Sequence, residues 1–305
     1  MPATTTRGRD VRGILLLDKP RGVTSNRALQ HVKRLFGAAK AGHTGSLDPL
    51  ATGMLPICFG AATRLGGFLL DAAKAYRVTA RFGVATDTAD ADGAVTERVD
   101  EPRPTLAALR EALGRFLGEI DQVPPMYSAL KQGGKRLYEL ARRGVVVERE
   151  ARRVTIFELV LERYEWPDAE IRVRCSKGTY VRSLVVDLAA ALGTVGHVAE
   201  LRRIGVEPFG GEPMATIEEL EALAASGGTA ALDARLLPPD RALVGWPEVL
   251  LSREAAERLA HGQAVAADPA WPHGRVKVYR EPHELMAIGE ITPDRVLAPQ
   301  RVFTR

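Results

Sequence analysis

The spacing of apolar and polar positions changes within the first segments of the chain. An uninterrupted apolar run, GILLL at 13–17, predicts a short buried strand that ends in a turn with proline and glycine. In NRALQHVKRLFG at 26–37 the apolar residues recur at helical spacing, which predicts a helix capped by Thr24 or Ser25 and stopped at Gly37. The chain therefore begins with a strand, a tight turn and a helix that carries basic residues.

Strand-like and helix-like patterns then follow each other. AYRVTARFG at 75–83 alternates like a half-buried strand, and RPTLAALREALGRFLG at 103–118 predicts an amphipathic helix with proline at its start and glycine at its end. QVPPMYSALKQGGKRLYELARRG at 122–144 predicts a projecting insertion with a rigid Pro-Pro turn, a Gly-Gly loop and a short basic helix. Further strands and a helix are expected in RRVTIFELVLERYE at 152–165 and AEIRVRCSKGTYVRSLVVDLAAALG at 169–193.

The pattern changes near residue 245. From there on, short apolar pieces such as RVKVYR at 275–280 and ELMAIGEI at 284–291 are separated by proline and glycine turns. This spacing predicts a small β-rich barrel or sandwich. We therefore expect two domains, 1–245 and 246–305, with the insertion at about 124–153 inside the first.

Composition excludes several classes of protein. The chain has 305 residues, of which 46% are hydrophobic and 26% charged, so it can bury a sizeable core. No apolar run approaches the ~20 residues of a membrane-spanning helix, and we expect no membrane attachment and no export. Two cysteines, Cys58 and Cys175, are too few for a disulfide framework or a multi-cysteine zinc site. Both are expected to be buried, in a reducing cytoplasm.

Positive charge is concentrated in two blocks. The whole chain is only mildly basic, at +4 with a pI near 9.2. Residues 1–40, however, hold nine Lys/Arg against two Asp/Glu, and residues 131–153 hold eight against three. Such blocks suit nucleic-acid binding, although solvated helix faces would give the same counts. Residues 246–305 hold eight basic and eight acidic residues and are net neutral.

One glycine-rich loop concentrates candidate chemistry. AGHTGSLDPLATG at 41–53 places Asp48 directly before Pro49 and between Gly45 and Gly53, which can expose a carboxylate on a rigid turn. An Asx-turn or a helix cap would explain the same residues. ATDTADADG at 85–93 resembles a calcium loop, but its spacing puts Thr88 and Val99 where carboxylates are needed. The chain also lacks the common nucleotide, dinucleotide, metalloprotease and serine-hydrolase motifs. An Asp-centred enzyme would therefore use covalent or acid/base chemistry, and we expect no cofactor and no metal.

Five segments resemble, in order, those of the bacterial tRNA pseudouridine synthase B family. They span roughly residues 12–210: LLLDKPRGVTS, AGHTGSLDPLATGMLPICFGAATR, KAYRVTARFGVATDTADADG, PPMYSALKQGGKRLYELARRG, and SKGTYVRSLVVDLAAALG with VAELRRIGV. The resemblance implies an α+β catalytic domain with a central mixed or antiparallel sheet flanked by helices. The segment beyond 245 is similar to a PUA domain, a small RNA-binding β-barrel.

The resemblance implies that the protein isomerises the tRNA T-loop uridine at position 55 to pseudouridine. It also implies roles for the residues that match the family's motifs. Asp48 is expected to be the catalytic carboxylate, Tyr76 to pack on the target base, and Arg182 to pair with Asp48. His43 is expected to fill the space left by the flipped base. The other substrate-binding residues are expected to be Tyr180, Leu201, Lys19, Pro20 and Arg64, of which Lys19 and Arg64 would meet the phosphate backbone. The insertion is expected to bind RNA through Lys131, Arg142, Arg143, Arg152 and Arg153.

Physical reasons accompany these roles. Conversion of uridine to pseudouridine is redox-neutral and consumes no water, so it requires no cofactor. Arg182 would keep Asp48 ionised inside a desolvated pocket, an effect of about 1 to 3 pKa units for such pairs. The phenol of Tyr76 could remove the C5 proton. Taken singly, Tyr76 and Leu201 could be plain core residues, His43 a structural histidine and Arg182 a surface arginine.

Two other classes compete with the enzyme hypothesis. One is a tRNA-binding folding chaperone in which catalysis is secondary, and the set Asp48, Tyr76, Tyr180 and Arg182 argues against it. The other is an Asp-nucleophile hydrolase of another fold, which would lack the metal ligands of phosphoryl chemistry. With tRNA as the partner, we expect a monomer in the cytoplasm, with no protein partner implied.

Overall fold

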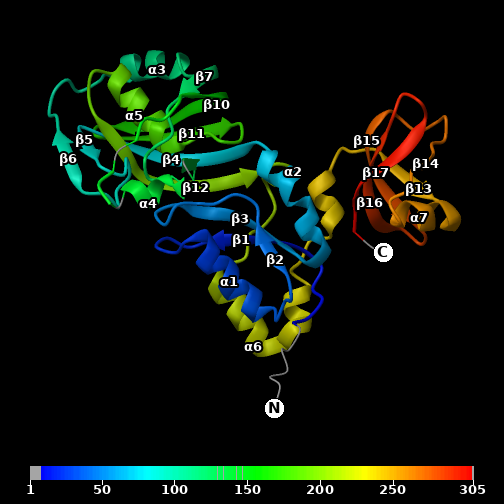
Figure 1. Cartoon of the computed structure of the whole chain (residues 1–305). Coiled ribbons are helices and arrows are strands. Elements are labelled where there is room, and N and C mark those ends of the chain that lie inside the picture. The colour runs from blue at the N-terminus through cyan, green and yellow to red at the C-terminus, as the bar shows by residue number, and fades with distance from the viewer. Residues whose placement is uncertain (1–7, 129, 133, 142, 146, 304–305) are drawn as a thin grey trace.

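The computed structural model describes residues 8–128, 130–132, 134–141, 143–145 and 147–303. It contains a large mixed sheet flanked by helices and a separate five-stranded sheet at the C-terminal end (Figure 1). The predicted α+β class, with a central mixed sheet and a small β-rich C-terminal part, is confirmed. No helix of the described residues is both long and apolar enough to cross a membrane.

The predicted first strand and helix form as expected. Strand β1 (Gly13–Lys19) is buried except for Asp18, and helix α1 (Ser25–Leu35) begins after Thr24, whose side chain accepts a hydrogen bond from the Arg27 amide. Gly37 follows the helix with a φ of 59°, a left-handed conformation that suits glycine. The local sequence signals therefore determine both ends of this unit.

The large sheet has the order β1-β3-β12-β4-β11-β10-β7, with β2 paired to β3. Its other strands are β2 (Ala41–His43), β3 (Thr52–Phe59), β4 (Lys74–Phe82), β7 (Gly118–Gln122), β10 (Arg152–Glu165), β11 (Asp168–Cys175) and β12 (Gly196–Val206). Strand β12 pairs antiparallel with β4 but parallel with β3, over only two residue pairs. This short parallel contact joins the two halves of the sheet and places β12 between the start of β3 and β4.

Helices cover different parts of the sheet. Helix α3 (Leu106–Gly114) and helix α5 (Val181–Ala191) pack on β4, β10, β11 and β12, whereas α1 and α6 (Ile217–Asp233) pack on β1 and β3 (Figure 1). The helix predicted over 103–118 is shorter than expected. It begins after Thr105, whose side chain caps it, and ends at Gly114, because the chain turns there toward β7, which starts at Gly118 with a φ of 86°.

Short elements complete this part of the chain. The turn η1 (Gly60–Leu65) and helix α2 (Gly66–Asp71) link β3 to β4, and the hairpin β5 (Val84–Thr86) with β6 (Val95–Arg98) follows β4. The insertion contains β8 (Lys131–Gln132), β9 (Lys135–Arg136) and α4 (Leu137–Ala141), in agreement with a predicted turn and short helix. Both cysteines are buried, as expected.

The C-terminal sheet has the order β13-β15-β16-β17-β14. It is reached through the turn η2 (Pro239–Leu243) and consists of β13 (Glu248–Leu251), β14 (Val265–Ala266), β15 (Gly274–Arg280), β16 (Glu284–Ile291) and β17 (Val296–Val302), with helix α7 (Arg253–Ala260). Both strands predicted here, at 275–280 and 284–291, are confirmed. Ile288 of this sheet is fully buried in an apolar cluster with residues of β1, β3 and α2, so the two sheets share a packed contact.

Candidate active site

The loop that carries Asp48 is fixed at several points. Leu47 and Leu50, on either side of Asp48, are buried in the core under the sheet. The Ser25 hydroxyl, at the start of α1, donates to the Leu47 carbonyl (3.0 Å) and accepts from the Leu47 amide (2.7 Å). The Asp48 carbonyl accepts from the Ala51 amide at 3.1 Å. Asp48 is therefore held by its backbone and its neighbours, and its carboxylate is left free for other contacts.

Lys19 lies beneath this loop and differs from the prediction. Its side chain is fully buried, and its ammonium donates to the carbonyls of Pro20 (2.8 Å), Val23 (2.7 Å) and Pro49 (3.5 Å). An ammonium has three donors, and all three are used inside the protein. The expectation that Lys19 meets the phosphate backbone is therefore corrected: Lys19 links the turn after β1 to the Asp48 loop. The Pro20 carbonyl is one of these three acceptors.

Arg182 of helix α5 is the counter-ion of Asp48. Its side chain is only 4% exposed, and its Nη2 lies 2.8 Å from Asp48 Oδ2. The same guanidinium donates to the carbonyls of Thr88 and Tyr127, both at 2.7 Å, and lies 3.7 Å from Oδ2 of the buried Asp90. Arg182 is thus fixed by groups from two other segments of the chain, besides its contact with Asp48.

The ionisation of Asp48 is set by opposing effects. Its side chain is 42% exposed toward a cavity, and protein surrounds the carboxylate on its other sides. This burial raises the pKa of Asp48 above its ordinary value, while the charge and hydrogen bond of Arg182 lower it. Asp90 raises the pKa further and Lys19 lowers it. The carboxylate is therefore a stronger base than a free aspartate, with Arg182 as the group that favours its charged form.

A cavity of about 370 Å³ opens next to this ion pair. It brings together five of the predicted residues, which are Asp48, Tyr76, Tyr180, Arg182 and Leu201. They come from the loop before β3, from β4, from both sides of the start of α5, and from β12. The cavity therefore gathers segments that lie far apart in the sequence around a single carboxylate.

Two tyrosines form part of the cavity lining. Tyr76 is 9% exposed, and burial raises the pKa of its phenol, as it does for Tyr180. Gln122 holds the backbone of Tyr180: its side-chain oxygen accepts from the Tyr180 amide (2.7 Å) and its nitrogen donates to the Tyr180 carbonyl (3.0 Å). Both phenols are therefore protonated near neutral pH.

Arg203 is a cavity residue that sequence reasoning missed. It lies opposite Tyr76 in the pairing of β12 with β4, and its side chain is 1% exposed. Its guanidinium donates to the carbonyls of Met54 (2.7 Å) and Gly45 (3.1 Å), and its charge opposes the effect of burial on the pKa of Tyr76. Period-two alternation could have found it, because Leu201 and Arg203 share one face of the strand.

Asp90 and Thr88 were also missed, although their segment was considered as a calcium loop. The Thr88 hydroxyl donates to Asp90 Oδ1 at 2.6 Å, and the Thr88 carbonyl accepts from Arg182. The acidic segment therefore binds an arginine of its own chain. In the described part of the chain, no group of three or more His, Cys, Asp or Glu residues could hold a metal ion.

Other predicted residues lie outside this cavity lining. His43, on β2, is half-buried; burial and the charge of Arg203 lower its pKa, so it is neutral at pH 7. Arg64 is exposed on η1 and donates to the Val302 carbonyl of β17. The structure brings neither side chain into the cavity around Asp48.

The insertion residues are described only in part. Arg142 lies outside the described residues, and Lys131 is described only as part of β8. Arg143 and Arg152 are exposed. Arg153 is exposed as well, but lies 3.6 Å from Asp121 and 3.8 Å from Glu119. Part of the positive charge of this block is therefore already balanced by β7.

Comparison with known proteins identifies relatives over almost the whole chain. Residues 33–181 match the profile of the TruB family pseudouridylate synthase N-terminal domain, residues 182–244 that of the tRNA pseudouridylate synthase B C-terminal domain, and residues 247–303 that of the pseudouridine synthase II TruB C-terminal region. The tRNA pseudouridine synthase B of Ectopseudomonas mendocina (strain ymp) is 53% identical over 297 residues, which cover 97% of this chain and 96% of that protein. The protein of the same name from Yersinia pestis (strain Pestoides F) is 49% identical over 304 residues, with 97% and 93% covered.

Solved structures show the same fold. A Cbf5-Nop10-Gar1 complex contains a chain that matches with a TM-score of 0.73 and 26% identity, over 96% of this chain and 85% of that one. An archaeal box H/ACA sRNP Nop10-Cbf5 complex matches with a TM-score of 0.72 and 24% identity, over 97% and 87%.

Proposed function

Because the chain belongs to the TruB family of pseudouridylate synthases, we infer that it isomerises uridine to pseudouridine in tRNA, and we propose the T-loop uridine at position 55 as its target. The observation that carries the assignment to this cavity is the ion pair of Asp48 with the buried Arg182, at 2.8 Å, beside Tyr76 and Leu201. Such a carboxylate, raised in basicity yet kept charged, suits covalent or acid/base attack on a nucleoside.

The reaction has a simple balance. The bond from C1′ to N1 breaks, a bond from C1′ to C5 forms, N1 gains a proton and C5 loses one, with no net consumption of water. A T-loop uridine must first leave its stack, which costs a few kcal/mol. We propose that the uracil enters the cavity between Tyr76 and Leu201, and that His43 fills the space it leaves in the RNA. Neutral His43 suits contact with unpaired bases rather than with phosphates.

Asp48 must be ionised for either first step that its position supports. In one, the carboxylate attacks C1′ and holds the ribose while the base turns; in the other, it removes the 2′ proton to give a glycal-like intermediate. Attack on uracil C6 is a third, less favoured route. In each case Arg182 stabilises the charged carboxylate before reaction, in a site already organised by the Thr88 and Tyr127 carbonyls.

Tyr76 is proposed to handle the C5 proton. Burial keeps the phenol of Tyr76 protonated. The phenol can therefore accept the C5 proton only if it gives up its own proton at the same time, or if it has first ionised to phenolate. Arg203 favours the phenolate, both as a charge and as a hydrogen-bond partner. The structure therefore couples the base role of Tyr76 to a neighbouring cation.

The alternative of a tRNA-folding chaperone with secondary catalysis is disfavoured, since the names of the full-length relatives are those of enzymes. As an enzyme of tRNA, the chain is proposed to work in the cytoplasm and as a monomer. The solved chains of similar fold belong to complexes with other proteins; we propose that this one acts without them. The proposed boundary between its domains remains near residue 245.

Tritium release tests the function and the target. A tRNA transcript labelled with 5-tritiated uridine is incubated with the wild-type enzyme, which should release one tritium per tRNA. A transcript with cytidine at position 55 should release none, and Asp48→Asn should bind the normal transcript without releasing tritium. Undiminished release from the cytidine transcript would move the target elsewhere, and full activity of Asp48→Asn would exclude the proposed role of this carboxylate.

A further inference from the structure

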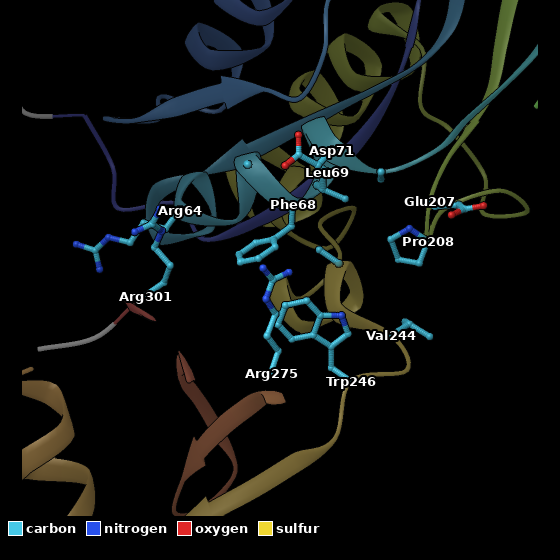
Figure 2. Close-up of a pocket in the computed structure, with 13 residues that line it drawn as sticks. Arg64, Phe68, Leu69, Asp71, Glu207, Pro208, Val244, Trp246, Arg275 and Arg301 are labelled. Carbon is cyan, nitrogen blue, oxygen red and sulfur yellow. The ribbon is translucent and has the colours of Figure 1, made fainter. Parts of the chain in front are cut away.

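A second cavity lies between the two sheets. It has a volume of about 520 Å³ and is lined by η1 and α2 on one side and by β15, β17 and the segment before β13 on the other (Figure 2). None of the residues assigned to the reaction lines it. Arg64, predicted to meet RNA phosphates, lies at its edge beside Arg301 (Figure 2).

Arg275 is held inside this cavity by two aromatic rings. Phe68 and Trp246 meet edge to face, with ring centroids 5.2 Å apart and planes at 86°. The guanidinium carbon of Arg275 lies 5.7 Å from the centroid of each ring, and Figure 2 shows the side chain between them. Rings hold a guanidinium through its flat face and leave its N–H edge free for an anion.

The cavity has a surplus of positive charge. Its two carboxylates are already paired: Asp71 lies 2.8 Å from Lys177 Nζ, and Glu207 lies 2.9 Å from Arg174 Nη1. Within the described residues, neither Arg64, Arg275 nor Arg301 has a carboxylate partner; Arg64 and Arg301 donate only to the carbonyls of Val302 and Gln300. Within the described residues, three arginines without a carboxylate partner therefore line one cavity.

The cavity adjoins the catalytic one. Leu69, Asp71 and Ala72 line it, while Leu70 and Lys74 of the same short segment line the cavity around Asp48. An RNA chain that places a nucleotide beside Asp48 needs to cross only this segment to reach Arg275. RNA carries one phosphate per nucleotide, and planar guanidiniums bind phosphate oxygens in pairs.

We propose that this cavity binds a backbone phosphate of the tRNA, with Arg275 as its main ligand and Arg64 and Arg301 as supporting charges. The proposal rests on the proposed function, since tRNA is the ligand. It assigns the contact between the two sheets a role in binding RNA: the site exists only while Arg275 of β15 lies against Phe68 of α2. The rings preorganise the arginine, so that little side-chain entropy is lost on binding.

The test measures tRNA binding by full-length Asp48→Asn protein, in which RNA is not turned over. Arg275→Gln is added to this background and compared with Arg258→Gln, which removes the same charge from exposed α7, away from the cavity. We expect Arg275→Gln to raise the Kd for tRNA about 5- to 20-fold at about 100 mM salt and to reduce the slope of log K against log salt by about 1. Arg258→Gln should change neither.

Two further arms separate the possible results. Arg275→Lys should keep most of the salt slope, because it keeps the charge, yet bind less tightly than Arg275. Binding of inorganic phosphate at millimolar concentration is measured with the Asp48→Asn protein, with and without Arg275→Gln. If phosphate binds only in the presence of Arg275 while tRNA affinity is unchanged by Arg275→Gln, the site serves a small anion and the inference is wrong. Equal Kd and slope for the Gln variants at 275 and 258 would overturn it too. Failure of the proposed function would show separately, as absence of tritium release by the enzyme with Asp48.

Discussion

Replacement of Arg182 should shift the pH dependence of the reaction. The ion pair at 2.8 Å is the only one with Asp48 among the described residues, and the arginine is 4% exposed. Without its charge, burial and the nearby Asp90 both raise the pKa of Asp48, and only the weaker effect of Lys19 opposes them. If the ionised carboxylate is the reacting form, as proposed, the acid limb of the rate profile should then lie at higher pH.

The magnitude follows from the geometry. An opposite charge at this distance lowers a carboxyl pKa by about 1 to 3 units, and the 42% exposure of the Asp48 side chain places the effect in the lower part of that range by screening. We expect the acid limb to move up by about 1 to 2 pH units, or about 1.4 to 2.7 kcal/mol of differential stabilisation. Below the shifted pKa, activity falls about tenfold for each unit of pH.

The variants must also leave the fold intact. Removal of Arg182 alone would leave Asp90, which is 5% exposed, as a buried charge without its partner. Asp90→Asn is therefore made in every arm, since its amide oxygen can still accept from the Thr88 hydroxyl. Arg182→Gln in this background is compared with Arg182→Lys, which loses the same paired geometry but keeps a charge.

Single-turnover tritium release is then measured from pH 5 to 10. The Gln variant should recover activity as the pH rises, with its acid limb displaced; the Lys variant should keep the limb of the Asp90→Asn parent at a lower plateau. If the limb stays in place in the Gln variant, Arg182 does not control the charge of Asp48, and the reasoning fails.

Three other predictions follow from buried groups. Lys19→Met leaves three carbonyls without their donor and should lower the free energy of unfolding, measured by urea denaturation, by about 1 to 3 kcal/mol. The Kd for tRNA should change little. Weaker RNA binding at unchanged stability would show that the ammonium reaches RNA. Gly53→Ala would place a Cβ 2.2 Å from the Arg203 carbonyl oxygen at a φ of 96°, and it should lower the free energy of unfolding by about 1 to 3 kcal/mol or more. Gly67→Ala is the control, since a Cβ there has no atom within 4 Å. Equal melting temperatures of the two variants would contradict this prediction. Burial raises the pKa of Cys58 to about 12 and of Cys175 to about 11. Neither thiol should therefore react with a disulfide reagent at pH 8 while the protein is folded. Fast labelling of either thiol in the native state would refute their burial.

The sequence allowed good prediction where short-range signals determine structure. The apolar run of β1, the Thr24 cap of α1 and the left-handed Gly37 are local features, and all formed as expected. The group around Asp48 was predicted through motif resemblance, and the structure brings its core members to one cavity. The end of α3 was missed because Gly118 belongs to the next strand, a tertiary preference that helical spacing does not contain.

Charged residues were the weaker part of the prediction. Lys19 was expected at the phosphate backbone from the family resemblance, but the convergence of three carbonyls from two loops depends on how those loops meet. Asp90 was dismissed with a calcium loop, since nothing local indicates that an arginine from α5 lies above it. Period-two spacing did contain a signal for Arg203, which lies opposite Tyr76.

Four buried cations lie in the Asp48 loop region and the cavity lining, and three of them are held mainly by backbone carbonyls. Lys19, Lys74 and Arg203 each donate to carbonyls, and only Arg182 pairs with Asp48. A carbonyl fixes a cation without neutralising it, so Lys74 and Arg203, which line the cavity, keep a positive potential that attracts RNA phosphates, whereas Lys19 lies beneath the loop. Desolvation lowers the pKa of Lys19 and of Lys74 to about 8, so both lose charge above that pH. Lys19 then ceases to lower the pKa of Asp48. Loss of the Lys74 charge, in the lining of the cavity, should therefore weaken RNA binding on the alkaline side of the pH profile.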